Sequence, residues 1–226
     1  MTDGCSACGF EFAGLNHAPV NQPGKPRLAV LGSGKGSNFI ALAEAIQAGA
    51  LTAEIALVVS DVESAGILQH ARDRGLRAEY LPPGPYRSKF DEATEARLIE
   101  LLCAAKAEWV VLAGFMRILK GEFLRHHAQR VVNIHPSLLP AFPGLEAWKQ
   151  ALDYGVKITG CTVHLVDQGI DTGPIVAQAA VPVLSNDTAV TLHERIQKAE
   201  RQLYPAALQR LLTGRVKIEG RRTFDA

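Results

Sequence analysis

Residues 27–48 read RLAVLGSGKGSNFIALAEAIQA, and this stretch decides the fold class. The apolar run Leu28–Leu31 predicts a buried strand, and the apolar positions of Phe39–Ala48 recur with the period of a helix. The glycine-rich segment Gly32–Asn38 joins the two directly. A strand, a glycine loop and a helix in this order are typical of α/β proteins that contain a mostly parallel sheet.

The same alternation continues downstream and predicts further strands and helices. Strands are expected at Ile55–Ser60, Ala78–Leu81, Trp109–Ala113 and Val131–Ile134, and helices at Ala65–Arg74 and Lys89–Ala105. Gly49 and Gly75 are placed as helix C-terminal stops. Several strands are apolar throughout, which indicates a sheet with helices on both faces.

After Pro140 the pattern changes from strand–helix units to a pair of long β-rich runs. We expect a short helix at Glu146–Asp153, strands at Ile158–Val166 and Ile175–Val183, and a final helix at Ala189–Leu212. Apolar residues at 192, 196, 199, 203, 207 and 211 give that helix one buried stripe. Pro205 should bend it, because proline removes a backbone donor and clashes with the preceding turn.

Composition excludes several classes of function. The 226 residues carry 24 basic and 23 acidic side chains, a net charge of +1, so no nucleic-acid face is apparent. The longest apolar run, Trp109–Met116, is shorter than the roughly 18 to 20 residues of a membrane span. With no signal pattern at the N-terminus, we expect a cytoplasmic protein without membrane contact.

The N-terminal region differs from the rest of the chain. Residues 1–26 show no sustained period and are predicted to be a flexible extension, followed by one domain over 27–226. Cys5 and Cys8 have the spacing of half a zinc site, but no second pair follows, so no metal is predicted. Cys103 and Cys161 are expected to be buried in a helix and a strand, which argues against a disulfide framework.

The loop Gly32–Asn38 has the character of an anion site. Its backbone N–H groups and the following helix N-terminus converge on one point, which suits a single phosphate. The dinucleotide fingerprint requires glycine at position 37, where the chain has Ser37, and the P-loop Gly-Lys-Ser/Thr is absent. Two alternatives stay open: a tight turn with Ser37 as a mere N-cap, and a nicotinamide cofactor whose ribose binds Asp61.

Asn133 and His135 form the strongest catalytic candidate. They lie two apart on a strand, so their side chains share one face near the carboxyl end of the sheet, and Pro136 stiffens the exit. An amide donor beside a titratable imidazole suits acyl transfer, because the amide stabilises an oxyanion and the imidazole moves protons. The alternative is structural, with His135 satisfying a buried carbonyl and Asn133 ordering a turn.

The loop 166–174 supplies two carboxylates that could orient His135. Either Asp167 or Asp171 could stabilise the imidazolium, and spacing does not choose between them. His164 could join these acids and His135 in a metal site, but the acyl-transfer chemistry requires no metal.

Five segments together resemble the phosphoribosylglycinamide formyltransferases over Arg27–Gly214. They are GSGKGSN at 32–38, VLAGFMRIL at 111–119, NIHPSLLPAFPG at 133–144, GCTVHLV at 160–166 and GIDTGP at 169–174. Methionyl-tRNA formyltransferases and formyltetrahydrofolate deformylases share the Asn and His, but those chains carry extra domains. The resemblance implies a Rossmann-like formyltransferase fold with a twisted, mostly parallel sheet of about seven strands.

The resemblance also implies roles for individual residues. Asn133, His135 and Asp171 would be catalytic, which selects Asp171 over Asp167. The residues implied to bind 5-phosphoribosylglycinamide are Gly34, Lys35, Gly36, Ser37, Asn38, Pro136, Lys198 and Glu200, with Glu200 on the ribose. Those implied to bind the folate are Lys89, Phe115, Met116, Arg117, Ile118, Leu119, Asn133, Val166, Asp167, Gln168, Gly169, Ile170 and Asp171, with Lys89 and Arg117 toward its acid tail.

The implied reaction is direct formyl transfer from 10-formyltetrahydrofolate, a co-substrate, to the amine of 5-phosphoribosylglycinamide in purine synthesis. The enzyme would be a monomer or homodimer and would use no metal. Rival hypotheses are a deformylase, a formyltransferase for another amine such as a sugar nucleotide, and a non-catalytic nucleotide- or NAD-binding module.

Overall fold

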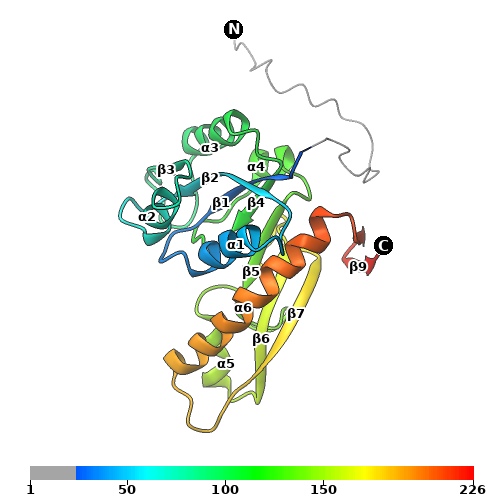
Figure 1. Cartoon of the computed structure of the whole chain (residues 1–226). Helices are drawn as coiled ribbons and strands as arrows, with labels where there is room; N and C mark the ends of the chain where they lie inside the picture. Colours follow the sequence, from blue (N-terminus) through cyan, green and yellow to red (C-terminus); the bar gives the residue numbers. More distant parts are fainter. Residues whose placement is uncertain (1–23) are drawn as a thin grey trace.

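A computed structural model describes residues 24–226, and within them a seven-stranded sheet forms the centre of the molecule (Figure 1). The strand order is β3-β2-β1-β4-β5-β6-β7. The strands of this sheet are β1 (Arg27–Leu31), β2 (Glu54–Ser60), β3 (Ala78–Tyr80), β4 (Trp109–Leu112), β5 (Val131–His135), β6 (Ile158–Leu165) and β7 (Ile175–Pro182). The helices are α1 (Ser37–Gln47), α2 (Gly66–Arg72), α3 (Glu92–Ala104), α4 (Gly121–His126), α5 (Ala147–Tyr154) and α6 (Ala189–Leu212).

The first five strands are parallel, and β6 runs antiparallel to both of its neighbours. The predicted α/β class, the mostly parallel sheet and the late pair of strands are therefore confirmed. The chain builds outward from β1 through β2 to β3 and then returns to place β4 on the other side of β1. In open sheets such a reversal leaves a crevice outside the carboxyl ends of the two strands, where ligands bind. The loops after β1 and β4 therefore border the expected ligand crevice.

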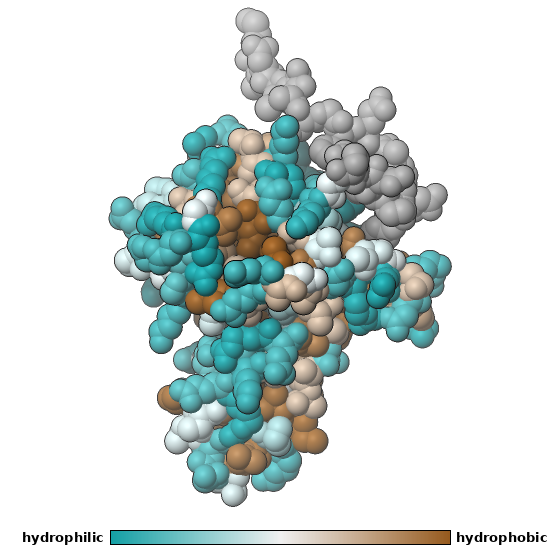
Figure 2. Space-filling view, in the orientation of Figure 1, coloured by the Kyte–Doolittle hydropathy of each residue, from teal (hydrophilic) through white to brown (hydrophobic). Residues whose placement is uncertain are grey.

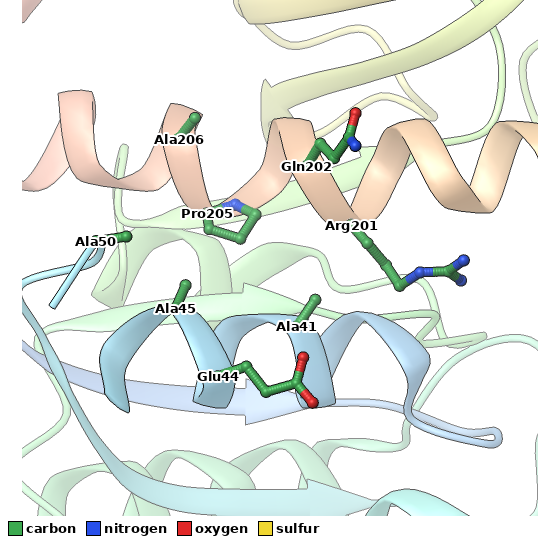
Figure 3. Close-up of a pocket in the computed structure, with 8 residues that line it drawn as sticks. All are labelled: Ala41, Glu44, Ala45, Ala50, Arg201, Gln202, Pro205 and Ala206. Carbon is green, nitrogen blue, oxygen red and sulfur yellow. The ribbon is translucent and has the colours of Figure 1, made fainter. Parts of the chain in front are cut away.

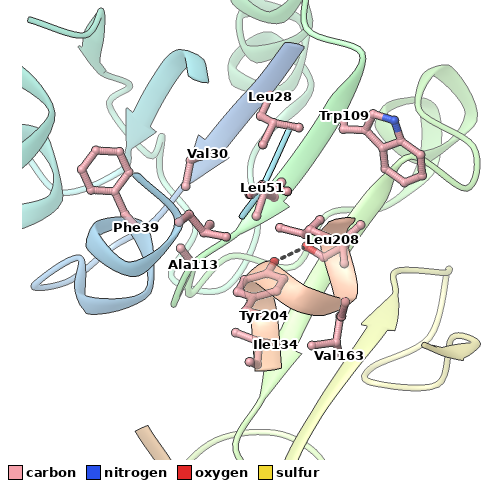
Figure 4. Close-up of a cluster of buried hydrophobic side chains, with 14 of the residues drawn as sticks. Leu28, Val30, Phe39, Leu51, Trp109, Ala113, Ile134, Val163, Tyr204 and Leu208 are labelled. Atoms are coloured by element: carbon pink, nitrogen blue, oxygen red, sulfur yellow. Dashed lines mark hydrogen bonds between the residues drawn. The ribbon is translucent and has the colours of Figure 1, made fainter. Parts of the chain in front are cut away.

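Helices cover both faces of the sheet and form two apolar layers. One layer joins alternate residues of β1 such as Leu28 and Val30 with α1, α2 and α6, and the other joins Ala29 and Leu31 with α3 and α4. The alternation follows from the two-residue period of a strand. Tyr204 of α6 is fully buried in the first layer, where its hydroxyl contacts Leu112 O at 2.9 Å and Val132 O at 3.0 Å (Figure 4). This side chain fixes α6 to β4 and β5.

The last helix runs without interruption through Pro205. Figure 3 shows Pro205 on the side of α6 that faces α1, above Ala41 and Ala45. The groove between the two helices is also lined by Ala206, so small side chains let α1 and α6 lie close together. The buried stripe of α6 includes the predicted positions 192, 196, 207 and 211, but also Glu200 and Tyr204.

Several predicted boundaries are wrong at their ends. The helix expected from Lys89 begins at Glu92, because the side chain of Asp91 accepts a hydrogen bond from Thr94 N and caps the first turn. The helix expected from Phe39 begins at Ser37. Cys103 is exposed, contrary to prediction, whereas Cys161 is buried in β6. Residues 1–23, with Cys5 and Cys8, lie outside the described part, so the predicted extension stays a prediction.

Two further elements had no counterpart in the sequence prediction: helix α4 and a hairpin of β8 (Val216–Glu219) and β9 (Arg222–Asp225). The hairpin docks on the main sheet through Thr223, whose hydroxyl donates to Ile175 O at 2.7 Å. At the opposite end, beneath α5 in Figure 1, apolar patches reach the surface in Figure 2. Exposed apolar residues between α5 and the start of α6 in the sequence include Tyr154, Ile158, Leu184 and Val190. Over residues 24–226, no helix combines the length and apolarity that a bilayer crossing requires.

Candidate active site

The two strongest candidates lie on β5, where the sheet changes from parallel to antiparallel pairing. In the β5–β6 register Asn133 is opposite His164, and His135 is opposite Thr162. Side chains directly opposite each other in an antiparallel pair project to the same face. The fold therefore brings two imidazoles and one amide together on one side of the sheet.

His164 is held in place by contacts at both of its ring nitrogens. Its Nδ1 is 2.8 Å from Leu165 O, and a carbonyl can only accept, so Nδ1 carries the proton. Its Nε2 lies 3.2 Å from Asn133 Nδ2 and 3.6 Å from Asp171 Oδ1. This pairing fixes the orientation of the Asn133 amide. His164 thereby positions one of the two predicted catalytic residues.

His135 lies between a carbonyl and a carboxylate. Its Nε2–H donates to Phe142 O at 2.8 Å, and its Nδ1 is 3.3 Å from Asp171 Oδ2. Asp171 is held in turn by Gly144 N, which donates to Oδ2 at 2.8 Å, and its other oxygen is 3.6 Å from His164 Nε2. The structure thus places one carboxylate within reach of both imidazoles.

Burial and charge act in opposite directions on this cluster. Burial is the largest effect on His135 and lowers its pKa, although the Asp171 carboxylate and Phe142 O oppose the shift. Burial raises the pKa of Asp171, but the His164 hydrogen bond, the charge of His135 and the Gly144 hydrogen bond together bring it below its ordinary value. Burial therefore opposes a positive charge on His135, whereas the contacts of Asp171 favour its ionised form.

The structure distinguishes the two acids of the 166–174 loop. Asp167 Oδ1 accepts from Gly169 N at 3.0 Å and from Thr172 Oγ1 at 2.6 Å, so Asp167 orders its own loop. Asp171 instead faces His135 from a left-handed backbone conformation with φ of 53°. Short polar side chains tolerate this region better than most residues. The two carboxylates therefore have separate tasks, one in the loop and one against the imidazoles.

The glycine loop after β1 has the shape expected of an anion site. Gly36 is the N-cap residue of α1, with φ of 85°, and a Cβ there would lie 2.8 Å from Ile67 Cα. A side chain at this position would therefore strain both the backbone and the packing against α2. Ser37 is the first residue of the helix, and no side chain caps it, so the alternative in which Ser37 serves only as the N-cap is wrong. The first-turn N–H groups have no partner within the helix and face the loop.

Asn38 connects this loop to the far end of the chain. Its Nδ2 donates to Glu200 Oε2 of α6 at 3.0 Å, and its Oδ1 is buried without a partner among the described residues. Burial raises the pKa of Glu200, against the opposing effects of Asn38 and Arg201. Lys198 is two residues from Glu200, about 200° around the helix, and its side chain is exposed on another side of α6. The structure therefore brings Asn38 and Glu200 together but leaves Lys198 apart.

The residues expected to contact the folate form two walls. Phe115 packs against Phe90 with ring centroids 5.9 Å apart, Met116 is 55% exposed, and Leu119 is buried. Lys89 forms a parallel bridge with Ile118 and places Nζ 4.8 Å from the centre of the Tyr86 ring. On the other wall Gln168 accepts from Gly121 N at 3.1 Å, and Ile170 is half-exposed. We expect the folate to lie between these two walls.

Sequence reasoning missed three contributions to the site. It considered His164 only as a metal ligand, because the β5–β6 register that places it opposite Asn133 is a long-range pairing. It also missed Phe142 O and Gly144 N, which are backbone groups without a side-chain signature. The sequence offered one signal for His164: Thr162 and His164 are two residues apart, so their side chains share a face of β6 by strand alternation.

Comparison with known proteins identifies relatives over most of this domain. A family model described as formyl transferase matches residues 26–208. The chain is 40% identical over 186 residues to the phosphoribosylglycinamide formyltransferase of Bacillus subtilis, covering 82% of this chain and 94% of that protein. It is 44% identical over 196 residues to the trifunctional purine biosynthetic protein adenosine-3 of Drosophila melanogaster, covering 86% of this chain. The chain spans only 14% of the length of that multifunctional relative.

Solved structures give the same picture. The glycinamide ribonucleotide transformylase 1 of Symbiobacterium toebii superposes with a TM-score of 0.86 at 46% identity, over 90% of this chain and 95% of that one. A formyltetrahydrofolate deformylase from Pseudomonas syringae superposes with a TM-score of 0.83 at 28% identity, over 90% of this chain and 66% of the deformylase. The match to the transformylase thus extends over nearly all of both chains.

Proposed function

The chain belongs to the formyl transferase family, and from that premise we propose that it transfers a formyl group from 10-formyltetrahydrofolate to the amino group of 5-phosphoribosylglycinamide. The reaction is a step of purine synthesis. The observation that carries the proposal is the convergence of Asn133, His135 and Asp171 at the carboxyl end of β5, with His135 Nδ1 3.3 Å from Asp171 Oδ2.

The chemistry requires a donor where negative charge develops. As the substrate amine attacks the formyl carbon, the carbonyl oxygen becomes an oxyanion in a tetrahedral intermediate. The Asn133 amide, whose orientation His164 holds, stabilises that oxygen by hydrogen bonding. Because the amide is positioned before the reaction begins, little reorganisation is required as the charge forms.

His135 supplies the second contact. Its Nε2–H bonds to Phe142 O in this structure, and a developing oxyanion is a stronger acceptor than a carbonyl and competes for that hydrogen. The attacking amine must lose a proton and the leaving folate nitrogen must gain one, so the proton moves from the first to the second with no net change in the protein. The Asp171 carboxylate, which faces His135 Nδ1 at 3.3 Å, holds the imidazole in place and stabilises positive charge on it while its Nε2–H bonds to the oxyanion.

The glycine loop and α6 are suited to the ribonucleotide substrate. We assign the phosphate to the N–H groups of Gly34–Asn38 at the start of α1, and the ribose to the Glu200 side chain. The buried Oδ1 of Asn38, which lacks a partner among the described residues, supports a polar ligand on this side. Pro136, which directly follows His135 at the end of β5, is assigned to the same substrate. The walls at 115–119 and 166–171 are assigned to the folate, with Lys89 toward its acid tail.

The decisive experiment measures formyl transfer with both small molecules. The purified chain should convert 10-formyltetrahydrofolate to tetrahydrofolate only when 5-phosphoribosylglycinamide is present. Release of formate without the amine would instead identify a deformylase, and turnover with a sugar-nucleotide amine alone would identify a different acceptor.

Three parallel measurements address the remaining predictions. Calorimetry with a folate analogue and with NAD tests the binding-module hypothesis, because a module would bind NAD and not the folate. Both carboxylate oxygens of Asp61 already accept hydrogen bonds from protein side chains, which removes the residue basis for a ribose contact there. Sedimentation distinguishes the predicted monomer from the homodimer, and cell fractionation tests the predicted cytoplasmic location.

A further inference from the structure

A buried ionic network holds one of the two predicted folate walls, the one formed by Lys89 and residues 115–119. We call this wall the folate wall. No step of the proposed reaction uses the network. Its centre is Asp61, at the end of β2, whose side chain is 2% exposed. Arg117 Nε donates to Asp61 Oδ2 at 2.7 Å, and Ser33 Oγ donates to Asp61 Oδ1 at 2.5 Å. Ser33 Oγ also accepts from Met116 N at 2.9 Å. The chain of donors therefore runs from the Met116 backbone through Ser33 to the carboxylate.

The network joins segments that are distant in sequence. Ser33 belongs to the loop after β1, and Met116 and Arg117 follow β4. The Arg117 guanidinium also donates to Tyr86 O at 2.6 Å and to Arg87 O, which holds the segment that carries Lys89. Ile118 N donates to Ser88 O at 2.8 Å beside this contact. One carboxylate thus fixes both strips of backbone that form the folate wall.

The opposite side of the crevice is supported independently. The glycine loop is held by Ile67 N, which donates to Gly34 O at 3.1 Å, and by the Asn38–Glu200 hydrogen bond. Neither contact passes through Asp61. Disturbing the network should therefore loosen the folate wall while it leaves the phosphate loop in place.

We propose that Asp61 is a positioning residue for the folate substrate, acting through Arg117 and Ser33 on the backbone at 115–119 and 86–89. This inference rests on the proposed function for the identity of the ligand. It assigns the Arg117 side chain to holding the wall. The Arg117 side chain is 13% exposed, and its Nε and Nη1 already donate to groups within the protein.

The test substitutes Asp61 and compares the two substrates. Asp61→Asn keeps the shape of the side chain but leaves Arg117 without its counter-charge, and a hydrogen bond to a charged group is typically strong enough to change affinity by about tenfold or more. We expect the KM for 10-formyltetrahydrofolate to rise at least about fivefold, while the KM for 5-phosphoribosylglycinamide stays within about twofold. Equal changes in both KM values, or no change in either, would overturn the proposal.

A matched control is available in the same fold. The Asp187 side chain is also 2% exposed and pairs with Arg195 at 2.7 Å, but it lies just before α6, where it accepts from Leu184 N, and makes no contact with residues of the folate wall. Asp187→Asn should lower the thermal midpoint as Asp61→Asn does without raising the folate KM. If it raised that KM to the same degree, general destabilisation would explain the effect and the positioning role would be rejected.

Two further measurements keep the proposal testable if Asp61→Asn folds poorly or the enzyme uses another substrate. Ser33→Ala retains the Asp61–Arg117 pair and removes only the link to Met116 N, so it should raise the folate KM by a smaller factor. Amide hydrogen exchange needs no substrate: exchange at 86–89 and 115–119 should accelerate in Asp61→Asn and not in Asp187→Asn. Unchanged exchange would refute the positioning role even if no formyl transfer were found, whereas failed transfer alone refutes the proposed function.

Discussion

At the scale of single residues, Asn133 and His135 carry the proposed chemistry. We expect Asn133→Ala and His135→Ala each to lower kcat by on the order of 100- to 1000-fold, because each removes a donor from the developing oxyanion. Steady-state transfer assays measure the loss, and circular dichroism checks that both variants remain folded.

Exposed residues of the same types provide the controls. Asn186→Ala and His126→Ala alter side chains outside the cluster and should keep wild-type turnover. Near wild-type kcat in either Asn133→Ala or His135→Ala would contradict the assignment of that residue.

Asp171 allows a test of the site's electrostatics. The Asp171 charge raises the pKa of His135, and burial lowers it. Asp171→Asn removes the charge, retains an oxygen for Gly144 N, and suits the left-handed backbone. The pKa of His135 should therefore fall further, and kcat should decrease by at least about tenfold. Titration of His135 by NMR measures the shift; an unchanged or higher pKa would show that the two groups are not coupled.

The sequence identified Asn133 and His135 because strand alternation and the carboxyl end of a parallel sheet are local and general rules. It did not choose between Asp167 and Asp171, since both lie on one irregular loop and only the tertiary fold decides which reaches His135. The family resemblance supplied that choice. The prediction missed the role of His164 for the same reason, because that role depends on the antiparallel register between β5 and β6.

Among the elements, α6 is the one that connects the sheet to the substrate side of the site. Tyr204→Phe retains the ring but removes the hydroxyl that contacts Leu112 O and Val132 O. Loss of this buried bond should reduce the free energy of unfolding by about 1–3 kcal/mol. Chemical denaturation measures the change, and Tyr154→Phe, at a side chain 79% exposed, is the matched control. Equal stability of the Tyr204 variant and the wild type would show that the hydroxyl contributes nothing.

Element prediction succeeded where apolar periodicity was strong and failed where it was weak. The strands of the sheet and the long α6 were found from their patterns. The start of α3 was misplaced, because the prediction overlooked Asp91 as an N-cap. Helix α4 has only six residues, and the β8–β9 strands have four each, too short for a clear period.

For the molecule as a whole, the buried thiol of Cys161 makes stability depend on pH in the alkaline range. Burial raises its pKa from 9.0 to about 12, so the folded protein keeps the proton while the unfolded chain begins to release it near pH 9. The unfolded state then binds fewer protons, and stability must fall as pH rises from about 9 toward 12.

Thermal midpoints between pH 8 and pH 10 measure this effect. The midpoint should decline over that range in the wild type and decline less steeply in Cys161→Ala, which lacks the thiol. Parallel pH profiles for the two proteins would exclude Cys161 as the cause.

The hydrogen bond between Asn38 and Glu200 spans 162 residues and has a consequence for synthesis on the ribosome. The chain emerges N-terminus first, so the phosphate loop, the Asn133–His135 strand and the folate wall all leave the tunnel before α6. Until Ala189–Leu212 is released, α6 cannot cover its face of the sheet over β4–β6. Apolar residues there, such as Val132, Ile134 and Val163, do not yet have the helix against which they pack. A nascent chain of this protein therefore passes through a stage at which its sheet exposes apolar surface that can associate with other chains, and at which its substrate site lacks Glu200. The synthesis of α6 covers that surface and completes the site.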